Sequence, residues 1–235
     1  MKSILNHIAF IPDGNRRWAK EQGVPQFEGH LAGYNRFKEV AQWCLDRGIE
    51  NVSFWGFSTE NWKRSREEVG YLMDLFLRVL TNDLLHFSQQ GFRLHVIGRR
   101  TDLSVKLQAA IQEAEKKTEG NTKAHLFLCF NYGGRPEIVE AVKTCLREGM
   151  DPEVLTEEDV ARRLWSAEMP DIDLIVRTSG EQRLSGFQPW KGAYAELFFT
   201  QNHWPAFEEK DLEAAIDFYK GRERRFGGDP TSQSV

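Results

Sequence analysis

Four clusters of polar residues in the sequence each follow an apolar run, and they combine carboxylate, hydroxyl and amide groups with arginines. The first cluster is the segment 13–18 (DGNRRW), directly after the run His7–Ile11. A carboxylate such as that of Asp13 can hold Mg²⁺, a hard cation that prefers oxygen ligands and keeps substrate phosphates in its shell. Gly14 would let the backbone approach a ligand closely, and the two arginines have the fork geometry of phosphate recognition. A capped turn with solvated arginines is the alternative for this segment taken alone.

The second and third clusters are less specific. The segment 57–64 (FSTENWKR) could grip a diphosphate and position a proton acceptor, or it could cap the helix that begins near Glu67. The segment 131–135 (NYGGR) contains a glycine pair that allows a tight turn into a helix from Pro136, which favours a structural interpretation.

The fourth cluster, the segment 177–185 (RTSGEQRLS), places two arginines and two serines around a glycine. This composition is typical of a diphosphate clamp, because the arginine side chain can form two parallel hydrogen bonds to phosphate oxygens. Glu196 comes shortly afterwards and could complete a metal site or bind an arginine.

Apolar runs alternate with helical patterns along the whole chain. We expect strands at His7–Ile11, Val52–Phe57, Arg93–Ile97, Ala124–Asn131, Asp173–Arg177 and Glu196–Thr200. Helical patterns lie near 30–47, 68–90, 102–118, 135–148, 156–165 and 209–224. This order predicts an α/β fold with one central, mostly parallel six-stranded sheet flanked by helices, in a single domain 1–235 with a loose tail at 227–235. Since ligands of open parallel sheets bind beyond the carboxyl ends of the strands, the four clusters are expected to meet at one edge.

Bulk properties narrow the class of protein. The chain has 235 residues, 40% of them hydrophobic and 28% charged, and a net charge of −4, so nucleic acid is not an expected partner. Three cysteines without a CxxC pair indicate reduced thiols and a cytoplasmic protein. Neither a signal peptide nor a transmembrane run is evident. Motifs of nucleotide-binding loops, zinc sites and serine hydrolases are also missing from the sequence.

The sequence resembles the cis-prenyltransferase (undecaprenyl diphosphate synthase-like) family from His7 to Gly228. The resemblance is carried by the following segments in this order: HIAFIPDGNRRWA (7–19), GH (29–30), FSTENWKR (57–64), NYGGRPEIV (131–139), DLIVRTSGEQRLS (173–185), AYAELFF (193–199), WPAF (204–207) and RERRFGG (222–228). It implies a Mg²⁺-dependent prenyl diphosphate synthase that takes dimethylallyl, geranyl, farnesyl or isopentenyl diphosphate. It also implies a homodimer, in which the tail Arg225-Phe226-Gly227 reaches the partner's site, and membrane contact only if the product is long.

The resemblance also implies roles for individual residues. Asp13 matches the family's essential aspartate, which binds Mg²⁺ and assists departure of the diphosphate, and Glu196 matches a second metal-linked carboxylate. Asn61 is the implied proton acceptor. The implied pocket for the allylic diphosphate consists of Gly14, Asn15, Arg16, Arg17, Trp18, His30 and Arg64. The implied site for the second substrate consists of Ser58, Thr59, Glu60, Trp62, Arg177, Arg183 and Ser185.

Several positions depart from the pattern common in undecaprenyl-type enzymes, namely Pro12, Gln26, Gln188, Pro189 and Lys191. The two prolines also resemble the lavandulyl-type branch, which joins allylic units head to middle. We therefore expect a short product that is branched by head-to-middle coupling, and ordinary head-to-tail coupling with isopentenyl diphosphate is the alternative. A non-catalytic subunit of the same fold is disfavoured because it should lack the aspartate and the first basic turn.

Product length is left open by the apolar residues. The periodic face of the helix expected over 68–90 is typical of a core helix, and periodicity does not distinguish this from a slot for an isoprenoid tail. Likewise, the aromatic residues Phe54, Trp55, Phe127 and Phe130 could plug a tunnel or simply fill the core.

Overall fold

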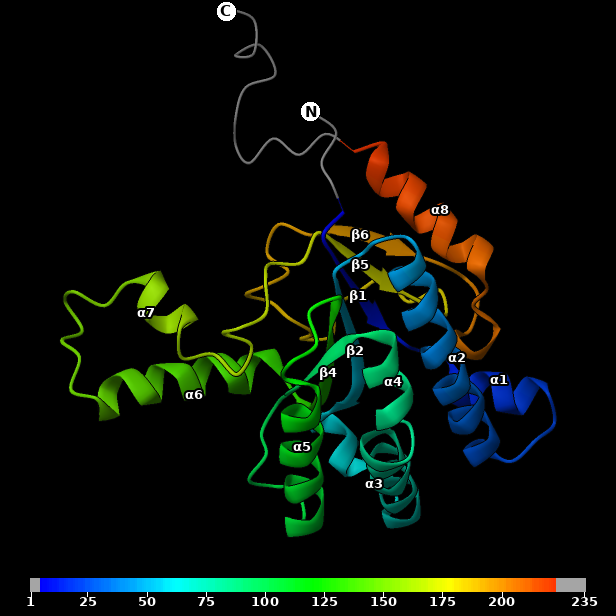
Figure 1. Ribbon diagram of the computed structural model, residues 1–235, viewed down its shortest axis with the longest axis horizontal. Helices are drawn as coiled ribbons and strands as arrows, with labels where there is room; N and C mark the ends of the chain where they lie inside the picture. Colours follow the sequence, from blue (N-terminus) through cyan, green and yellow to red (C-terminus); the bar gives the residue numbers. More distant parts are fainter. Residues whose placement is uncertain (1–4, 223–235) are drawn as a thin grey trace, which may run out of the picture.

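Six parallel strands form the centre of the molecule (Figure 1). The computed structural model describes residues 5–222. The strands are β1 (His7–Ile11), β2 (Asn51–Ser58), β3 (Phe92–Ile97), β4 (Ala124–Tyr132), β5 (Leu174–Arg177) and β6 (Glu196–Phe199). They lie in the order β3-β4-β2-β1-β5-β6, and every neighbouring pair is parallel. The predicted fold class and the six predicted strands are confirmed.

Parallel pairing brings the ends of the strands to a common edge. Ile11 of β1 pairs with Arg177 of β5, and Ser58 of β2 pairs with Tyr132 of β4. The segments that follow these residues therefore leave the sheet on the same side, as expected from the sequence.

The helices cover the two faces of the sheet unequally. They are α1 (Asn15–Glu21), α2 (Gln26–Asp46), α3 (Arg66–Thr81), α4 (Leu84–Gln90), α5 (Val105–Thr118), α6 (Gly134–Arg147), α7 (Glu157–Ala161) and α8 (Glu209–Lys220), with 3₁₀ turns η1 (Thr59–Lys63) and η2 (Trp204–Ala206). Helices α2, α3, α4, α5 and α8 cover one face of the sheet and form the largest apolar cluster with it. The other face packs against the irregular segment around Met169, Ile172 and Phe187, while α6 and α7 extend to one side (Figure 1).

Two features of the helices differ from the prediction. The helix expected over 68–90 is divided into α3 and α4 by a turn at Asn82 and Asp83. The apolar spacing continues from Leu80 to Leu84 across this turn, so periodicity alone gives no sign of the break. Helix α1 was not predicted, because its seven residues are too few to show an apolar period.

Within residues 5–222, none of the helices combines the length and the apolar character that a membrane crossing requires.

Candidate active site

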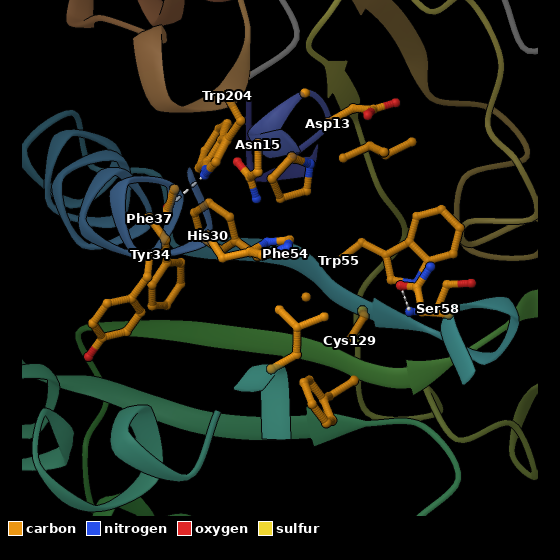
Figure 2. Close-up of a pocket in the computed structure, with 18 of the residues that line it drawn as sticks. Asp13, Asn15, His30, Tyr34, Phe37, Phe54, Trp55, Ser58, Cys129 and Trp204 are labelled. Carbon is orange, nitrogen blue, oxygen red and sulfur yellow. Dashed lines mark hydrogen bonds between the residues drawn. The ribbon is translucent and has the colours of Figure 1, made fainter. Parts of the chain in front are cut away.

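A cavity of about 730 Å³ opens at the carboxyl edge of the sheet and continues between the sheet, α2 and α3. Its polar part is lined by the ends of β1, β2 and β5, including Asp13, Arg64 and Arg177. Its apolar part is lined by Tyr34, Phe37, Phe54, Leu72, Leu75, Phe76, Val79, Leu128 and Phe130. Figure 2 shows Asp13 on one side of this space and the rings of Tyr34 and Phe37 on the opposite side. One continuous cavity therefore offers charged groups at one end and hydrocarbon at the other.

Asp13 is held at the centre of the polar part by two guanidinium groups. Its carboxylate accepts hydrogen bonds from Arg177 Nη2 at 2.9 Å and from Arg17 Nη2 at 3.1 Å. Burial alone would raise the pKa of the Asp13 carboxyl, but the hydrogen bonds and charges of Arg177 and Arg17 hold this pKa below its ordinary value. The carboxylate is therefore ionised at neutral pH and oriented before any ligand binds.

Gly14 and Asn15 form the entry of α1. Gly14 has a φ of 99°, a left-handed conformation that glycine adopts without strain. The side chain of Asn15 packs against Gly33 of α2, where an added Cβ would lie 2.5 Å from Asn15 Oδ1. This close contact fixes α1 against α2 and turns both residues toward the cavity.

Arg177 connects the loop after β5 to Asp13. Only 5% of its side chain is exposed, and Nη1 donates to Ser185 Oγ at 2.9 Å and to the carbonyl of Arg183. Glu181, a residue that the sequence did not single out, accepts hydrogen bonds from both Arg17 and Arg183. Arg17 of the first cluster and the arginines of the fourth cluster are therefore joined into one hydrogen-bonded network.

A second network lies at the mouth of the cavity around Glu68 of α3, which the sequence also did not single out. Its carboxylate lies 2.8 Å from Arg64 Nη1, 3.2 Å from His30 Nε2 and 3.7 Å from Arg16 Nη1. Burial would raise the pKa of Glu68, but the charge of Arg64, together with the Gln26 hydrogen bond and the charges of Arg16 and His30, lowers this pKa below its ordinary value. Burial lowers the pKa of His30 despite the opposing effect of Glu68. The predicted residues His30, Arg16 and Arg64 are thus brought together by one carboxylate.

The segment after β2 caps a turn and lines the cavity, but it does not cap the helix near Glu67. Ser58 caps the turn η1: its hydroxyl accepts the Glu60 N–H at 3.0 Å, and Asn61 Oδ1 accepts the Ser58 N–H at 3.0 Å. The helix near Glu67 is capped instead by Ser65. Nevertheless Ser58, Glu60 and Asn61 all line the cavity, so the cap also presents polar groups to a ligand.

Four predicted site residues lie outside the cavity lining: Trp18, Thr59, Trp62 and Glu196. Trp62 instead donates from Nε1 to Asn131 Oδ1 at 2.7 Å, which anchors η1 to the end of β4. Glu196 lies at the amino end of β6, three residues before the level of Arg177, so about 10 Å along the strand separates the two levels. It is bound by Arg222 Nε at 2.9 Å. A metal site shared by Asp13 and Glu196 is not formed within a single chain.

The unusual positions differ in their relation to the cavity. Pro12 lines it, and Gln26 hydrogen-bonds to Glu68 near its mouth. Gln188, Pro189 and Lys191 do not line it. Pro189 packs against Gly134, where an added Cβ would lie 2.1 Å from the proline Cδ. Of the five unusual positions, Pro12 and Gln26 are therefore at the cavity or near its mouth, and the other three do not line it.

The predicted tail motif Arg225-Phe226-Gly227 and the predicted loose tail at 227–235 lie outside the described residues.

The chain is similar in sequence to known prenyltransferases over nearly its whole length. A family model described as "Putative undecaprenyl diphosphate synthase" matches residues 11–227. The isoprenyl transferase of Thermotoga maritima is 43% identical over 228 residues, which cover 96% of this chain and 97% of that protein. The isoprenyl transferase of Fusobacterium nucleatum is 42% identical and covers 97% of each chain.

Two solved structures share the fold. One is lavandulyl diphosphate synthase from Lavandula x intermedia in complex with dimethylallyl diphosphate, with a TM-score of 0.90 and 36% identity over 94% of this chain and 98% of that chain. The other is a probable undecaprenyl diphosphate synthase from Campylobacter jejuni, with a TM-score of 0.81 and 30% identity over 96% and 99% of the two chains.

The network at the mouth makes a testable prediction for Glu68. Replacing Glu68 with glutamine removes the negative charge that opposes the effect of burial, so the pKa of His30 should fall further below its ordinary value. An NMR titration of the histidine ring signals measures this shift. Glu67→Gln is the matched control, since Glu67 is the exposed neighbour on the same helix and should leave His30 unchanged. An unchanged His30 titration in Glu68→Gln would contradict the proposed charge contact.

Proposed function

Because the chain belongs to the cis-prenyltransferase (undecaprenyl diphosphate synthase-like) family and is a prenyl diphosphate synthase, we propose that it couples an allylic diphosphate to isopentenyl diphosphate, head to tail, and releases diphosphate. The observation that carries this proposal is the single cavity in which a polar cluster around Asp13 continues into an apolar slot. An amphiphilic substrate with a diphosphate head and a hydrocarbon tail matches both ends of this cavity.

The residues of the polar part can be given roles in this reaction. Arg17, Arg177 and Arg183 would neutralise charge that develops on the departing diphosphate, and they are positioned before the reaction begins. The double bond of the second substrate would then attack the allylic carbon, which the apolar slot holds in register. Asn61 is the proposed proton acceptor, since it lines the same cavity.

Asp13 is the residue that would hold Mg²⁺. Its carboxylate faces the cavity and is kept ionised by two arginines, while no cluster of three metal-binding side chains is found within residues 5–222. This donor set fits Mg²⁺, which binds through one or two carboxylates plus substrate phosphates and water. When bound, Mg²⁺ stabilises the negative charge of the leaving diphosphate.

Head-to-tail coupling is the preferred type of reaction. It is supported by the isoprenyl transferases that are 42–43% identical over nearly the whole chain. The sequence argument for a branched product is weakened because Gln188, Pro189 and Lys191 do not line the cavity.

Head-to-middle coupling of two allylic diphosphates is the second candidate. Two specific observations favour it: the TM-score of 0.90 to the lavandulyl diphosphate synthase, and the position of Pro12 in the cavity wall.

A short product is proposed from the aromatic side chains in the apolar part. The rings of Phe76 and Phe130 stack at 3.6 Å with an interplanar angle of 7°, and Phe57 packs on Phe130 at 5.2 Å. Both stacked rings line the cavity and connect α3 to β4. Such a pair leaves less room for a growing hydrocarbon chain than aliphatic side chains would.

A homodimer is proposed from the less covered face of the sheet. Parallel sheets normally bury both faces, yet Leu197 of β6 is 37% exposed on the face opposite α8. Val139 and Leu146, two turns apart on α6, are 52% and 56% exposed. These apolar side chains on the α6 side of the sheet suit contact with a second copy of the chain. In such a dimer the second copy would also bring polar residues to Glu196, which lies far from Asp13 within its own chain.

Activity is tested by incubating the protein and Mg²⁺ with dimethylallyl, geranyl or farnesyl diphosphate, with and without isopentenyl diphosphate. We expect product only when isopentenyl diphosphate is present, loss of product with a chelator, and a decrease of at least about 100-fold in kcat for Asp13→Asn. Product from allylic diphosphates alone would favour head-to-middle coupling instead. Full activity of Asp13→Asn would contradict the proposed role of the carboxylate.

Product length is tested with Phe130→Leu. The smaller side chain should enlarge the slot and lengthen the product by at least one isoprene unit, as measured by chromatography of the dephosphorylated products. Phe127→Leu is the matched control, because Phe127 lies on the same strand but is buried on the opposite face of the sheet. Equal product lengths for the wild type and Phe130→Leu would show that this ring does not limit the chain.

The oligomeric state is tested by sedimentation equilibrium. We expect twice the mass of the chain for the wild type and a shift toward the single-chain mass for Leu146→Glu. Leu85→Glu is the control, since Leu85 is 65% exposed on α4, which packs on the other face of the sheet. A wild-type chain that sediments as a monomer would contradict the proposal.

A further inference from the structure

Three side chains outside the cavity lining form a hydrogen-bonded chain behind the Asp13 turn. Ser179 Oγ is hydrogen-bonded to His203 Nδ1, and His203 Nε2 lies 3.0 Å from Glu21 Oε1. They come from the loop after β5, the segment before η2 and the end of α1, respectively. The sequence places Ser179 within the fourth cluster but singles out neither His203 nor Glu21, because the three residues are far apart in the chain.

This serine–histidine pair packs directly against Gly14. A Cβ added to Gly14 would lie 2.3 Å from Ser179 Oγ and 2.6 Å from His203 Nδ1. The pair therefore lies directly against the turn, and only glycine fits at this position.

The residues next to the pair hold the backbone of Asp13. The Thr178 hydroxyl accepts the Asp13 N–H at 2.9 Å and donates to the Asp13 carbonyl at 2.7 Å, while the Trp204 N–H donates to the same carbonyl at 2.9 Å. The segments 178–179 and 203–204 thus contact two successive residues of the catalytic turn.

The arrangement resembles a nucleophilic serine with its base, but the position of Ser179 argues against that role. Ser179 is only 7% exposed, and Gly14, rather than Ser179, lines the cavity. Its φ of 79° is strained for a residue with a Cβ. This strain is maintained by the Ser179 N–H bonded to the Asn202 carbonyl at 2.7 Å and the Gly180 N–H bonded to the Thr200 carbonyl at 2.8 Å. The loop is built to hold the hydroxyl against Gly14.

We propose that His203 is a positioning residue for the transferase reaction: through its hydrogen bond to Ser179 it fixes the Gly14 side of the turn and so the placement of the Asp13 carboxylate. This inference rests on the proposed function of the Asp13 site. The bond to Glu21 orients the imidazole ring from the exposed side. The bond to Ser179 then holds the serine hydroxyl against Gly14.

Two substitutions separate these two bonds. The amide of His203→Asn ends near the former Nδ1 and can still bind Ser179, whereas the amide of His203→Gln reaches toward the former Nε2 and Glu21. We expect His203→Gln to lower kcat about 10-fold or more, because misplacement of catalytic groups is costly, with KM for both diphosphates changed by less than about twofold. His203→Asn should retain kcat within about threefold of the wild type.

Ser179→Ala provides an independent measurement that leaves His203 in place. It should lower kcat as His203→Gln does, and the double variant Ser179→Ala with His203→Gln should be no slower than either single variant, since both remove one bond. Substitutions of His86, an exposed histidine on α4, are the controls. All rates are measured well below the thermal midpoint of each variant.

The outcomes are distinct. Equal losses of kcat in His203→Asn and His203→Gln, wild-type kcat in His203→Gln, or additive losses in the double variant would each overturn the positioning role. If the wild type makes no prenyl product from any diphosphate pair, the proposed function fails instead, before the variants are compared.

Discussion

The contact between Arg177 and Asp13 is the interaction on which the rest of the site depends. Arg177 is almost fully buried at the end of β5, and a buried guanidinium needs a carboxylate and further acceptors to offset its loss of hydration. Asp13, Ser185 and the Arg183 carbonyl supply them. Removing one partner of such a pair typically costs about 3–5 kcal/mol, so the carboxylate and the loop 178–185 hold each other in place.

The parallel sheet makes this contact possible. Strands β1 and β5 are neighbours, and the pairing of Ile11 with Arg177 places the following residues side by side. The same direction of β2 and β4 brings Ser58 and the Asn131 turn to that edge. Charged groups thus collect where the strands end, while the apolar slot forms beside them, between the sheet and helices α2 and α3. The division of the cavity into a polar and an apolar part follows from the topology.

The sequence predicts the strands and the convergence of the four clusters, because both depend on local patterns and on the rules of parallel sheets. It does not reveal Glu68 or Glu181, which become part of the site only through contacts with arginines from other elements. Nor can it separate residues that line the cavity from those that support it. Trp62 stands within a polar cluster yet its indole anchors η1 to Asn131, and Glu196 stands at the wrong end of its strand to meet Asp13 in the same chain.

The residues that differ from the family pattern also divide into those that line the cavity and those that do not. Pro189 lies close in sequence to Ser185, which lines the cavity, yet its ring packs against Gly134 at the start of α6. Gln188 is buried and donates to Cys129 Sγ at 3.4 Å, outside the polar part of the cavity. Pro12, by contrast, precedes the carboxylate directly and lines the cavity. Because its φ is fixed by the ring, it limits how the chain enters the Asp13 turn, on the side opposite the Gly14 contact. The turn is thus constrained from both ends, and of the unusual residues near the site Pro12 acts on the position of the Asp13 carboxylate most directly.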